Sequence, residues 1–174
     1  MQENLHMNNS NNGLIECNIN NVEWGGSGIE KTLFDFISSK FVHNSNMVEI
    51  GSGYTSTGAF STIFNVYSID NDSKYQYIYK KVNYITAPLV DGWYDINILT
   101  KKLPEEYSFI FLDGPSGSGN RNEIIKNINL FKNVPIIVHD TYRIDELTLA
   151  VKLSMLLDKK IKIYSDNDFW AVIE

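Results

Sequence analysis

The sequence predicts a three-layer α/β fold, in which helices cover both faces of a mostly parallel sheet of about seven strands. Short apolar runs alternate with segments of helical periodicity from residue 47 to residue 173. A glycine-containing turn, Gly51-Ser52-Gly53, directly follows the first buried run. The last two apolar runs, 160–164 and 169–173, are joined by so short a turn that they must be antiparallel. The sheet is therefore expected to end in a reversed hairpin.

Length and composition are those of one soluble globular domain. The chain has 174 residues, of which 43% are hydrophobic and 21% charged. No apolar run approaches the roughly 18 residues that span a bilayer, and the start lacks a signal-peptide pattern, so we expect no membrane partner and a cytoplasmic location. The single cysteine, Cys17, excludes an intramolecular disulfide and a cysteine-based zinc site. The formal net charge of −6 argues against a nucleic-acid partner and favours a small-molecule acceptor.

The N-terminal part leads into the domain. Residues 1–13 are rich in asparagine and are predicted to lack fixed structure, which leaves 14–174 as a single domain. Weak alternation over 14–22 indicates an edge strand or a surface segment. Trp24 opens a glycine-rich loop that either closes over a ligand or simply precedes a helix. Apolar residues at helical spacing predict an amphipathic helix over 29–41.

The first half of the sheet follows. Runs 47–50 and 66–69 are predicted strands with a helix at about 56–64 between them. A short helix, capped by Asp72 or Ser73, is predicted to run through residue 81. A strand over 82–87 comes next, and Pro88 stops it. The loop 89–95 holds Trp93 at the expected ligand edge, before a short helix at 96–103.

The second half repeats the alternation. The run 108–112 is continuously apolar, as expected of a central parallel strand covered on both faces. A helix at about 122–131, a strand over 134–138 and a longer amphipathic helix over 145–157 follow.

Polar residues gather where the predicted strands end: Glu49, Asp70, Asp113, His139 and Asp140. Ligands of open α/β sheets bind at the carboxyl ends of the strands. The strands before Asp113 and Asp140 would be neighbours about 5 Å apart, so these carboxylates can share one small volume. His139 and Asp140 can both face the site only if the strand has already ended, because consecutive strand residues point to opposite faces.

The segment Glu49-Ile-Gly51-Ser-Gly53 resembles motif I, E/D-x-G-x-G, of the class I S-adenosylmethionine-dependent methyltransferases, whose Rossmann-like sheet also ends in a reversed hairpin. The resemblance implies that Glu49 lies near the methionine amino group, that the glycine turn passes under the cofactor, and that Asp70 holds the ribose hydroxyls. The implied cofactor contacts are Glu49, Gly51, Ser52, Gly53, Tyr54, Thr55, Asp70, Asn71 and Asp113. The dinucleotide fingerprint G-x-G-x-x-G would need glycine where Ser56 stands, so an NAD-dependent oxidoreductase is the less favoured alternative.

Three interpretations compete for the acidic pair. Asp113, Asp140 and Thr141 match positions that resemble the magnesium ligands of metal-dependent small-molecule O-methyltransferases. Alternatively, Asp113, His139 or Asp140 is the catalytic base that takes a proton from the acceptor hydroxyl. In the third interpretation these side chains only cap loops and helix starts.

The chain has only two arginines, Arg121 and Arg143, and both follow the ends of these same strands. They either hold an anionic group of the acceptor or pair internally with Glu123, Asp145 or Glu146. Trp24 and Trp93 are further candidate substrate-binding residues. The segments DGPSGSGNR and HDTYRIDE resemble bacterial methyltransferase-like proteins with Asp-Gly-Pro and Asp-x-x-Arg motifs. The Asn/Asp-Pro-Pro-Tyr segment of adenine and cytosine methyltransferases is absent from this sequence.

We therefore expect S-adenosylmethionine-dependent methylation of a small molecule, at oxygen, with metal assistance as an option. A non-catalytic module that binds an adenosyl ligand or a protein partner is the alternative of a different class. A chain of 174 residues has little insertion to form a substrate lid. A homo-oligomer, in which a second subunit supplies the lid, is therefore also considered.

Overall fold

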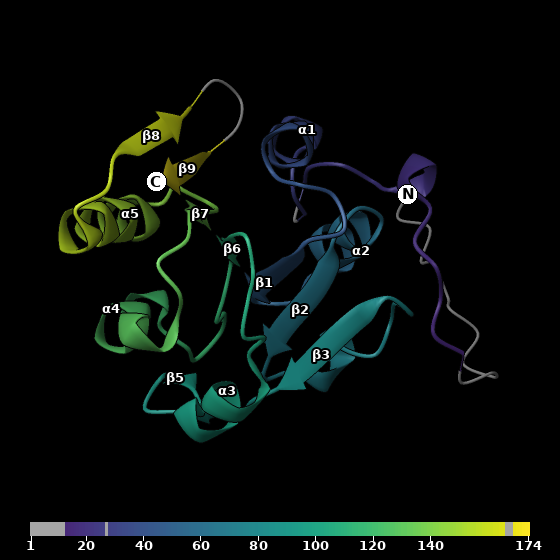
Figure 1. The fold of residues 1–174 in the computed structure, drawn as a ribbon, viewed down its shortest axis with the longest axis horizontal. Helices are drawn as coiled ribbons and strands as arrows, with labels where there is room; N and C mark the ends of the chain where they lie inside the picture. Colours follow the sequence, from purple (N-terminus) through teal and green to yellow (C-terminus); the bar gives the residue numbers. More distant parts are fainter. Residues whose placement is uncertain (1–12, 27, 166–168) are drawn as a thin grey trace.

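The computed structural model describes residues 13–26, 28–165 and 169–174; the predicted unstructured segment, apart from Gly13, and most of the turn after residue 164 lie outside them. Seven strands form one sheet in the order β3-β2-β1-β6-β7-β9-β8 (Figure 1). Their bounds are β1 Asn46–Ile50, β2 Asn65–Asp70, β3 Val82–Thr86, β6 Ile110–Leu112, β7 Ile136–Val138, β8 Ile161–Tyr164 and β9 Trp170–Ile173. All pairings are parallel except those of β9 with β7 and β8. The predicted parallel sheet with a reversed terminal hairpin is confirmed.

Helices cover both faces of this sheet (Figure 1). On one face lie α1 (Lys31–Lys40) and α2 (Tyr54–Ser61), and on the other α3 (Ile96–Lys102), α4 (Ile124–Asn127) and α5 (Ile144–Leu157). In the central strand Phe111 packs toward α1 and α2, whereas Ile110 and Leu112 pack toward α3 and α5. This two-sided burial explains the continuous apolar run. Within the described residues no helix combines the length and the apolar character needed to cross a bilayer.

The helix predicted to run from residue 72 through residue 81 is wrong beyond its first turn. Only a 3-10 helix, Ser73–Tyr75, forms there. Tyr77 has a positive φ of 58°, which interrupts a right-handed helix. The hydroxyl of Tyr84 accepts hydrogen bonds from the backbone N–H groups of Ile78 and Tyr79, at 3.2 and 3.0 Å. A side chain from β3 thus binds the amides that a helix would have used.

Other segments depart from the predictions in detail. The expected edge strand at 14–22 is reduced to one bridge, between Ile15 and Tyr79, and a 3-10 helix, Ile19–Asn21. The helix expected at 122–131 is divided into η3 Arg121–Glu123, α4 and η4 Ile128–Leu130. The loop 89–95 contains a small hairpin of β4 Leu89–Val90 and β5 Trp93–Tyr94. Its turn is Asp91-Gly92, both at positive φ, which is the conformation favoured in two-residue hairpins.

Two glycines meet at the carboxyl ends of the neighbouring strands β1 and β6. Gly51 adopts φ of +94°, and a Cβ added to it would lie 2.6 Å from the backbone nitrogen of Gly114. A Cβ added to Gly114 would lie 2.6 Å from Cα of Gly51 and 2.7 Å from the hydroxyl of Tyr94. The loops after the two strands therefore pack backbone to backbone, which only glycine permits.

We expect Gly114→Ala to lower the free energy of unfolding by about 1–3 kcal/mol, because the new methyl group would force the two loops apart. Gly13→Ala is the control, since a Cβ at Gly13 meets nothing within 4 Å. Urea denaturation of both variants and of the wild type measures the difference. Equal stability of the two variants would contradict the close packing of Gly51 on Gly114.

Candidate functional site

Glu49 lies fully buried beneath the glycine turn, at the end of β1. Its Oε2 accepts hydrogen bonds from the hydroxyls of Thr57 and Ser68, both at 2.6 Å. Its Oε1 is buried and makes no hydrogen bond with any described residue. Burial raises the pKa of Glu49 to about 7, and the surrounding hydroxyls oppose this shift only in part. The turn therefore covers a carboxyl group that has one oxygen unsatisfied.

Asp70 ends β2 and closes the same turn from the other side. Its Oδ2 accepts a hydrogen bond from the N–H of Ser52 at 2.9 Å, and its Oδ1 from that of Asp72 at 2.7 Å. Burial raises the pKa of Asp70, although these backbone hydrogen bonds favour the ionised form. The structure thus brings the glycine turn, Glu49 and Asp70 together, as the sequence motif implied.

The remaining predicted cofactor contacts border this turn. Tyr54 and Thr55 form the first turn of α2, and the side chain of Tyr54 is exposed. Asn71 follows Asp70 and is exposed as well. A Cβ added to Gly28 would lie 2.4 Å from Oγ1 of Thr55, so the glycine-rich loop before α1 packs closely against α2.

Asp113, His139 and Asp140 meet at the ends of β6 and β7. Because β7 ends at Val138 and Asp140 adopts a positive φ of 61°, both residues after the strand can turn toward Asp113. Nδ1 of His139 lies 3.2 Å from Oδ1 of Asp113 and 3.6 Å from Oδ1 of Asp140. One polar atom from each of the three side chains lies within 4.8 Å of the other two.

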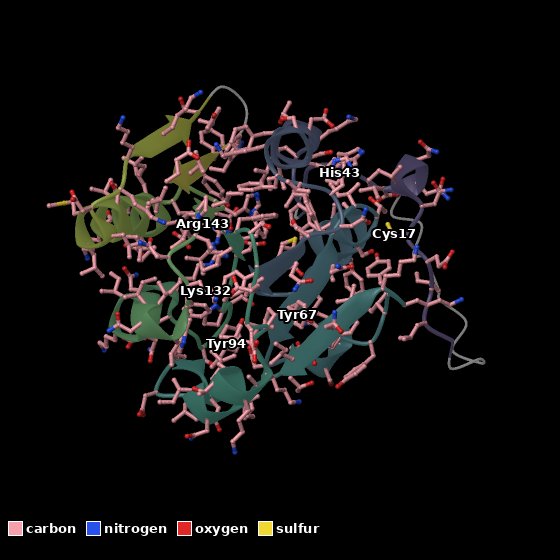
Figure 2. All side chains as sticks on the ribbon, in the orientation of Figure 1. Cys17, His43, Tyr67, Tyr94, Lys132 and Arg143 are labelled. Atoms are coloured by element: carbon pink, nitrogen blue, oxygen red, sulfur yellow. The ribbon has the colours of Figure 1, made fainter. Side chains whose placement is uncertain are left out.

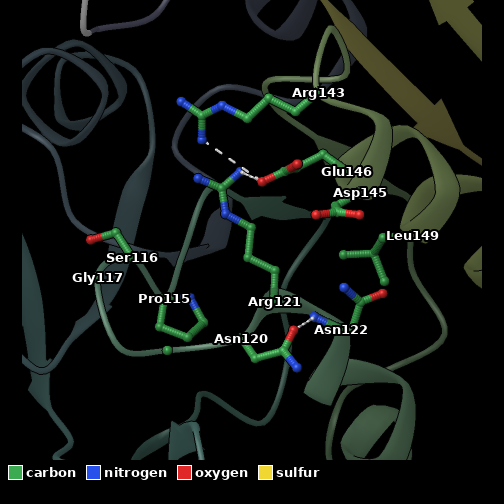
Figure 3. Close-up of a pocket in the computed structure, with 11 residues that line it drawn as sticks. Pro115, Ser116, Gly117, Asn120, Arg121, Asn122, Arg143, Asp145, Glu146 and Leu149 are labelled. Carbon is green, nitrogen blue, oxygen red and sulfur yellow. Dashed lines mark hydrogen bonds and ion pairs between the residues drawn. The ribbon is translucent and has the colours of Figure 1, made fainter.

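The guanidinium of Arg121 lies between the two carboxylates. Its Nη2 is 3.0 Å from Oδ1 of Asp113 and 3.4 Å from Oδ2 of Asp140, and its Nη1 is 3.6 Å from Oε1 of Glu146. Nη1 of Arg143 lies 3.1 Å from Oδ2 of Asp140 and 3.8 Å from Oε1 of Glu146. Figure 3 shows both guanidinium groups directed at Glu146. Internal pairing of the arginines, one of the two alternatives left open by the sequence, is thus present. Glu146, an expected partner, and Asp140, which was not expected, are each shared by both arginines.

His139 also contacts a residue on the face of the sheet that α1 covers, opposite the face covered by α5. Its Nε2 lies 3.4 Å from Oε2 of Glu30, the residue directly before α1. Burial disfavours the charged imidazole, but hydrogen bonds to Asp113 and Glu30 outweigh this effect and raise the pKa of His139 to about 10. The hydrogen bond to His139 lowers the pKa of Glu30. His139 is therefore a cation near neutral pH.

Tyr94 is a residue of the site that no sequence motif marked. Its side chain is buried beside Gly114 (labelled in Figure 2), and its hydroxyl has no hydrogen-bond partner in the described parts of the chain. Trp93, next to it, is 3% exposed and packs in the core. Trp24 packs against Phe34, with ring centroids 5.1 Å apart. Each predicted tryptophan thus makes apolar packing contacts.

A pocket of about 270 Å³ adjoins the acidic cluster, between the loop after β6 and the start of α5 (Figure 3). Its polar lining includes Arg121, Arg143, Asp145 and Glu146. Pro115 and Leu149 are among its apolar lining residues, and Ser116, Gly117, Gly119, Asn120 and Asn122 complete the wall. The lining thus combines charged side chains of both signs with amide and hydroxyl groups, so the pocket suits a polar ligand.

The donor set does not fit a divalent cation as it stands. Magnesium needs oxygen ligands that are free to face it. Asp113 and Asp140 already face Arg121, and each ring nitrogen of His139 faces a carboxylate. The hydroxyl of Thr141 is buried and forms no hydrogen bond with the described residues. A cation that used Asp113 and Asp140 would lie against the guanidinium of Arg121.

No protein-family model and no curated protein sequence matches the chain. Several solved structures match the chain in fold. The precorrin-6y C5,15-methyltransferase of Geobacter metallireducens matches with a TM-score of 0.59 at 14% identity, over 89% of this chain and 96% of that one. One chain of the E. cuniculi Mtq2–Trm112 complex, which is responsible for methylation of the eRF1 termination factor, matches with a TM-score of 0.52 at 15% identity. This match covers 86% of the present chain and 96% of that one.

The MycE methyltransferase of mycinamycin biosynthesis, solved with Mg and SAH, matches with a TM-score of 0.52 at 12% identity. This match covers 82% of the present chain and 46% of MycE. The three proteins act in different processes but share one arrangement of strands and helices with the present chain. The chain therefore has the fold of the class I S-adenosylmethionine-dependent methyltransferases.

Proposed function

We propose that this chain is an S-adenosylmethionine-dependent methyltransferase that acts on a hydroxyl group of a small, polar molecule. The supporting observation is the turn after β1, which the N–H of Ser52 ties to Asp70 at 2.9 Å while Glu49 lies beneath it. The bound cofactor supplies an electrophilic methyl group. Gly51, at φ of +94°, forms this turn, and its missing Cβ leaves room for the backbone of Gly114.

Different residues of the chain would bind different parts of the cofactor. Asp70 can accept hydrogen bonds from both ribose hydroxyls, because each carboxylate oxygen has a lone pair left beside its backbone hydrogen bond. The unsatisfied Oε1 of Glu49 suits the ammonium group of the methionine part. Residues 52–55, Asn71 and Asp113 would border the cofactor.

We assign the proton transfer to Asp140. Its carboxylate faces the site, with Oδ1 3.6 Å from Nδ1 of His139 and Oδ2 3.4 Å from Nη2 of Arg121. His139 is less suited to the role of base, since its pKa near 10 keeps it protonated, and we infer that it holds Asp113 in place. Asp113 would orient the acceptor beside the glycine turn.

The pocket beside the cluster would bind the rest of the acceptor. Arg121 and Arg143 line it, but both are paired with acids of the chain, so neither offers a free charge to an anionic acceptor. A neutral molecule with several hydroxyl groups would match the side-chain oxygen and nitrogen atoms of the wall.

Thermal unfolding with ligands tests the cofactor. S-adenosylhomocysteine at 100 times its Kd should stabilise the chain by about 2.7 kcal/mol, and NADH should have no effect. Asp70→Asn should remove most of the shift, because an amide cannot accept from both hydroxyls. Asp72→Asn, two residues away, is the matched control and should keep the shift. Stabilisation by NADH, or by neither ligand, would contradict the proposal.

Binding of S-adenosylhomocysteine near pH 7 should release a proton. The ligand's ammonium favours the carboxylate form of Glu49 and so lowers the pKa of this group from about 7. Isothermal titration calorimetry in buffers of different ionisation enthalpy measures the number of protons released. Glu49→Gln has no proton to lose and should show none. The same release by both proteins would place the titrating group elsewhere.

Asp140→Asn should keep the affinity for S-adenosylhomocysteine within about threefold and lower turnover by about 100-fold or more, as expected when a general base is lost. The assay follows formation of S-adenosylhomocysteine with a panel of polyhydroxylated acceptors. Asp145→Asn, on the pocket wall, is the control and should affect KM more than kcat. Unchanged turnover in Asp140→Asn would refute the assigned role.

A further inference from the structure

We propose that Arg121 is a built-in cation that takes the position between Asp113 and Asp140 that a divalent metal ion would otherwise need, so that this acidic pair works without a metal. The proposal rests on the function proposed above, whose acid cluster it concerns. It makes Arg121 a positioning residue, which acts through the two carboxylates.

The position of the guanidinium is the first argument. Its Nη2 is within 3.4 Å of an oxygen from each carboxylate, one at the end of β6 and one after β7. A single nitrogen thus bridges the two groups that a divalent cation would have to bridge. A planar guanidinium reaches several oxygen atoms at once and stays charged at every physiological pH.

The anchoring of the side chain is the second argument. Arg121 is only 9% exposed, and its Nη1 is directed at Glu146 on α5, 3.6 Å away. Nη1 is buried and forms no hydrogen bond of ordinary length with the residues the structure describes. Three acids on three separate elements therefore fix the guanidinium from two sides. A buried cation held in this way does not leave easily to admit a metal.

The local charge is the third argument. Four acids, Glu30, Asp113, Asp140 and Glu146, contact three cations, His139, Arg121 and Arg143, which leaves one negative charge. A divalent cation added to this group would reverse its sign and would lie against Arg121 at contact distance. Without Arg121 the same acids would have two uncompensated negative charges, which is the charge that one divalent cation balances.

The test compares the binding of Mn²⁺ and Mg²⁺ by the wild type, Arg121→Gln, Arg121→Ala and Arg121→Lys, with Arg143→Gln as the control. Mn²⁺ binding is followed by its electron paramagnetic resonance signal and by thermal unfolding, without cofactor. We expect no saturable binding by the wild type, Arg121→Lys or Arg143→Gln, and saturable binding by Arg121→Gln or Arg121→Ala, with a Kd at least about tenfold below the highest Mn²⁺ concentration at which the wild type fails to saturate. Adding Asp140→Asn to Arg121→Gln should abolish it.

Two results would overturn the proposal. Saturable Mg²⁺ binding by the wild type that Asp113→Asn removes would show that the pair is a metal site. Failure of the folded Arg121→Gln and Arg121→Ala proteins to gain binding would show that Arg121 does not hold a metal-like position. If neither variant folds, the wild-type titration and Arg121→Lys decide. The metal readout needs no S-adenosylmethionine, so it is independent of whether that cofactor binds.

Discussion

The contact between Gly51 and Gly114 joins the two halves of the site, which are the glycine turn after β1 and the acid cluster at the ends of β6 and β7. Gly51 begins the turn after β1, and Gly114 directly follows Asp113 at the end of β6. Because their backbones touch, Asp113 is held beside the turn, and its charge adds to the burial that raises the pKa of Glu49. The side chain of Tyr94 closes this junction from the β4–β5 hairpin. A displacement of either loop would therefore disturb both the glycine turn and the acid cluster.

Electrostatic pairing determines the arrangement of the acid cluster. Acids and bases alternate through it, in the order Glu30, His139, Asp113, Arg121, Asp140, Arg143 and Glu146. Buried charges are costly unless each has a partner, so an incorrectly placed side chain would leave its neighbour uncompensated. This requirement favours one arrangement of the cluster over others. It also explains why the two arginines have no charge to spare for an anionic ligand.

Much of the fold could be predicted, because burial on one or both faces of a sheet leaves a clear pattern. The apolar run before Leu112 and the short connection between the last two strands both had a single structural meaning. The prediction of a helix over 72–81 was wrong because the hydroxyl of Tyr84, which lies close to this segment only after folding, accepts hydrogen bonds from the N–H groups of Ile78 and Tyr79. The hairpin at Asp91-Gly92 carried a recognisable turn signal that the aromatic residues around it obscured.

The part of the site that lies at the ends of neighbouring strands could be predicted. The meeting of Asp113 with Asp140 followed from the adjacency of two strands. The ion-pair partners of Arg121 and Arg143 could not be predicted in this way, since an arginine side chain can reach several partners from one backbone position. Glu30 lies 109 residues from His139 along the chain, and no local pattern marks it. The partners of the buried charges are thus a property of the folded chain alone.

The most direct measurement is a crystal structure of the chain grown with S-adenosylhomocysteine. We expect the ribose within hydrogen-bond distance of Asp70, the amino group beside Glu49 and the sulfur facing the side of Asp113 and Asp140. A ligand bound away from the turn after β1, or crystals that exclude it at saturating concentration, would contradict the central claim.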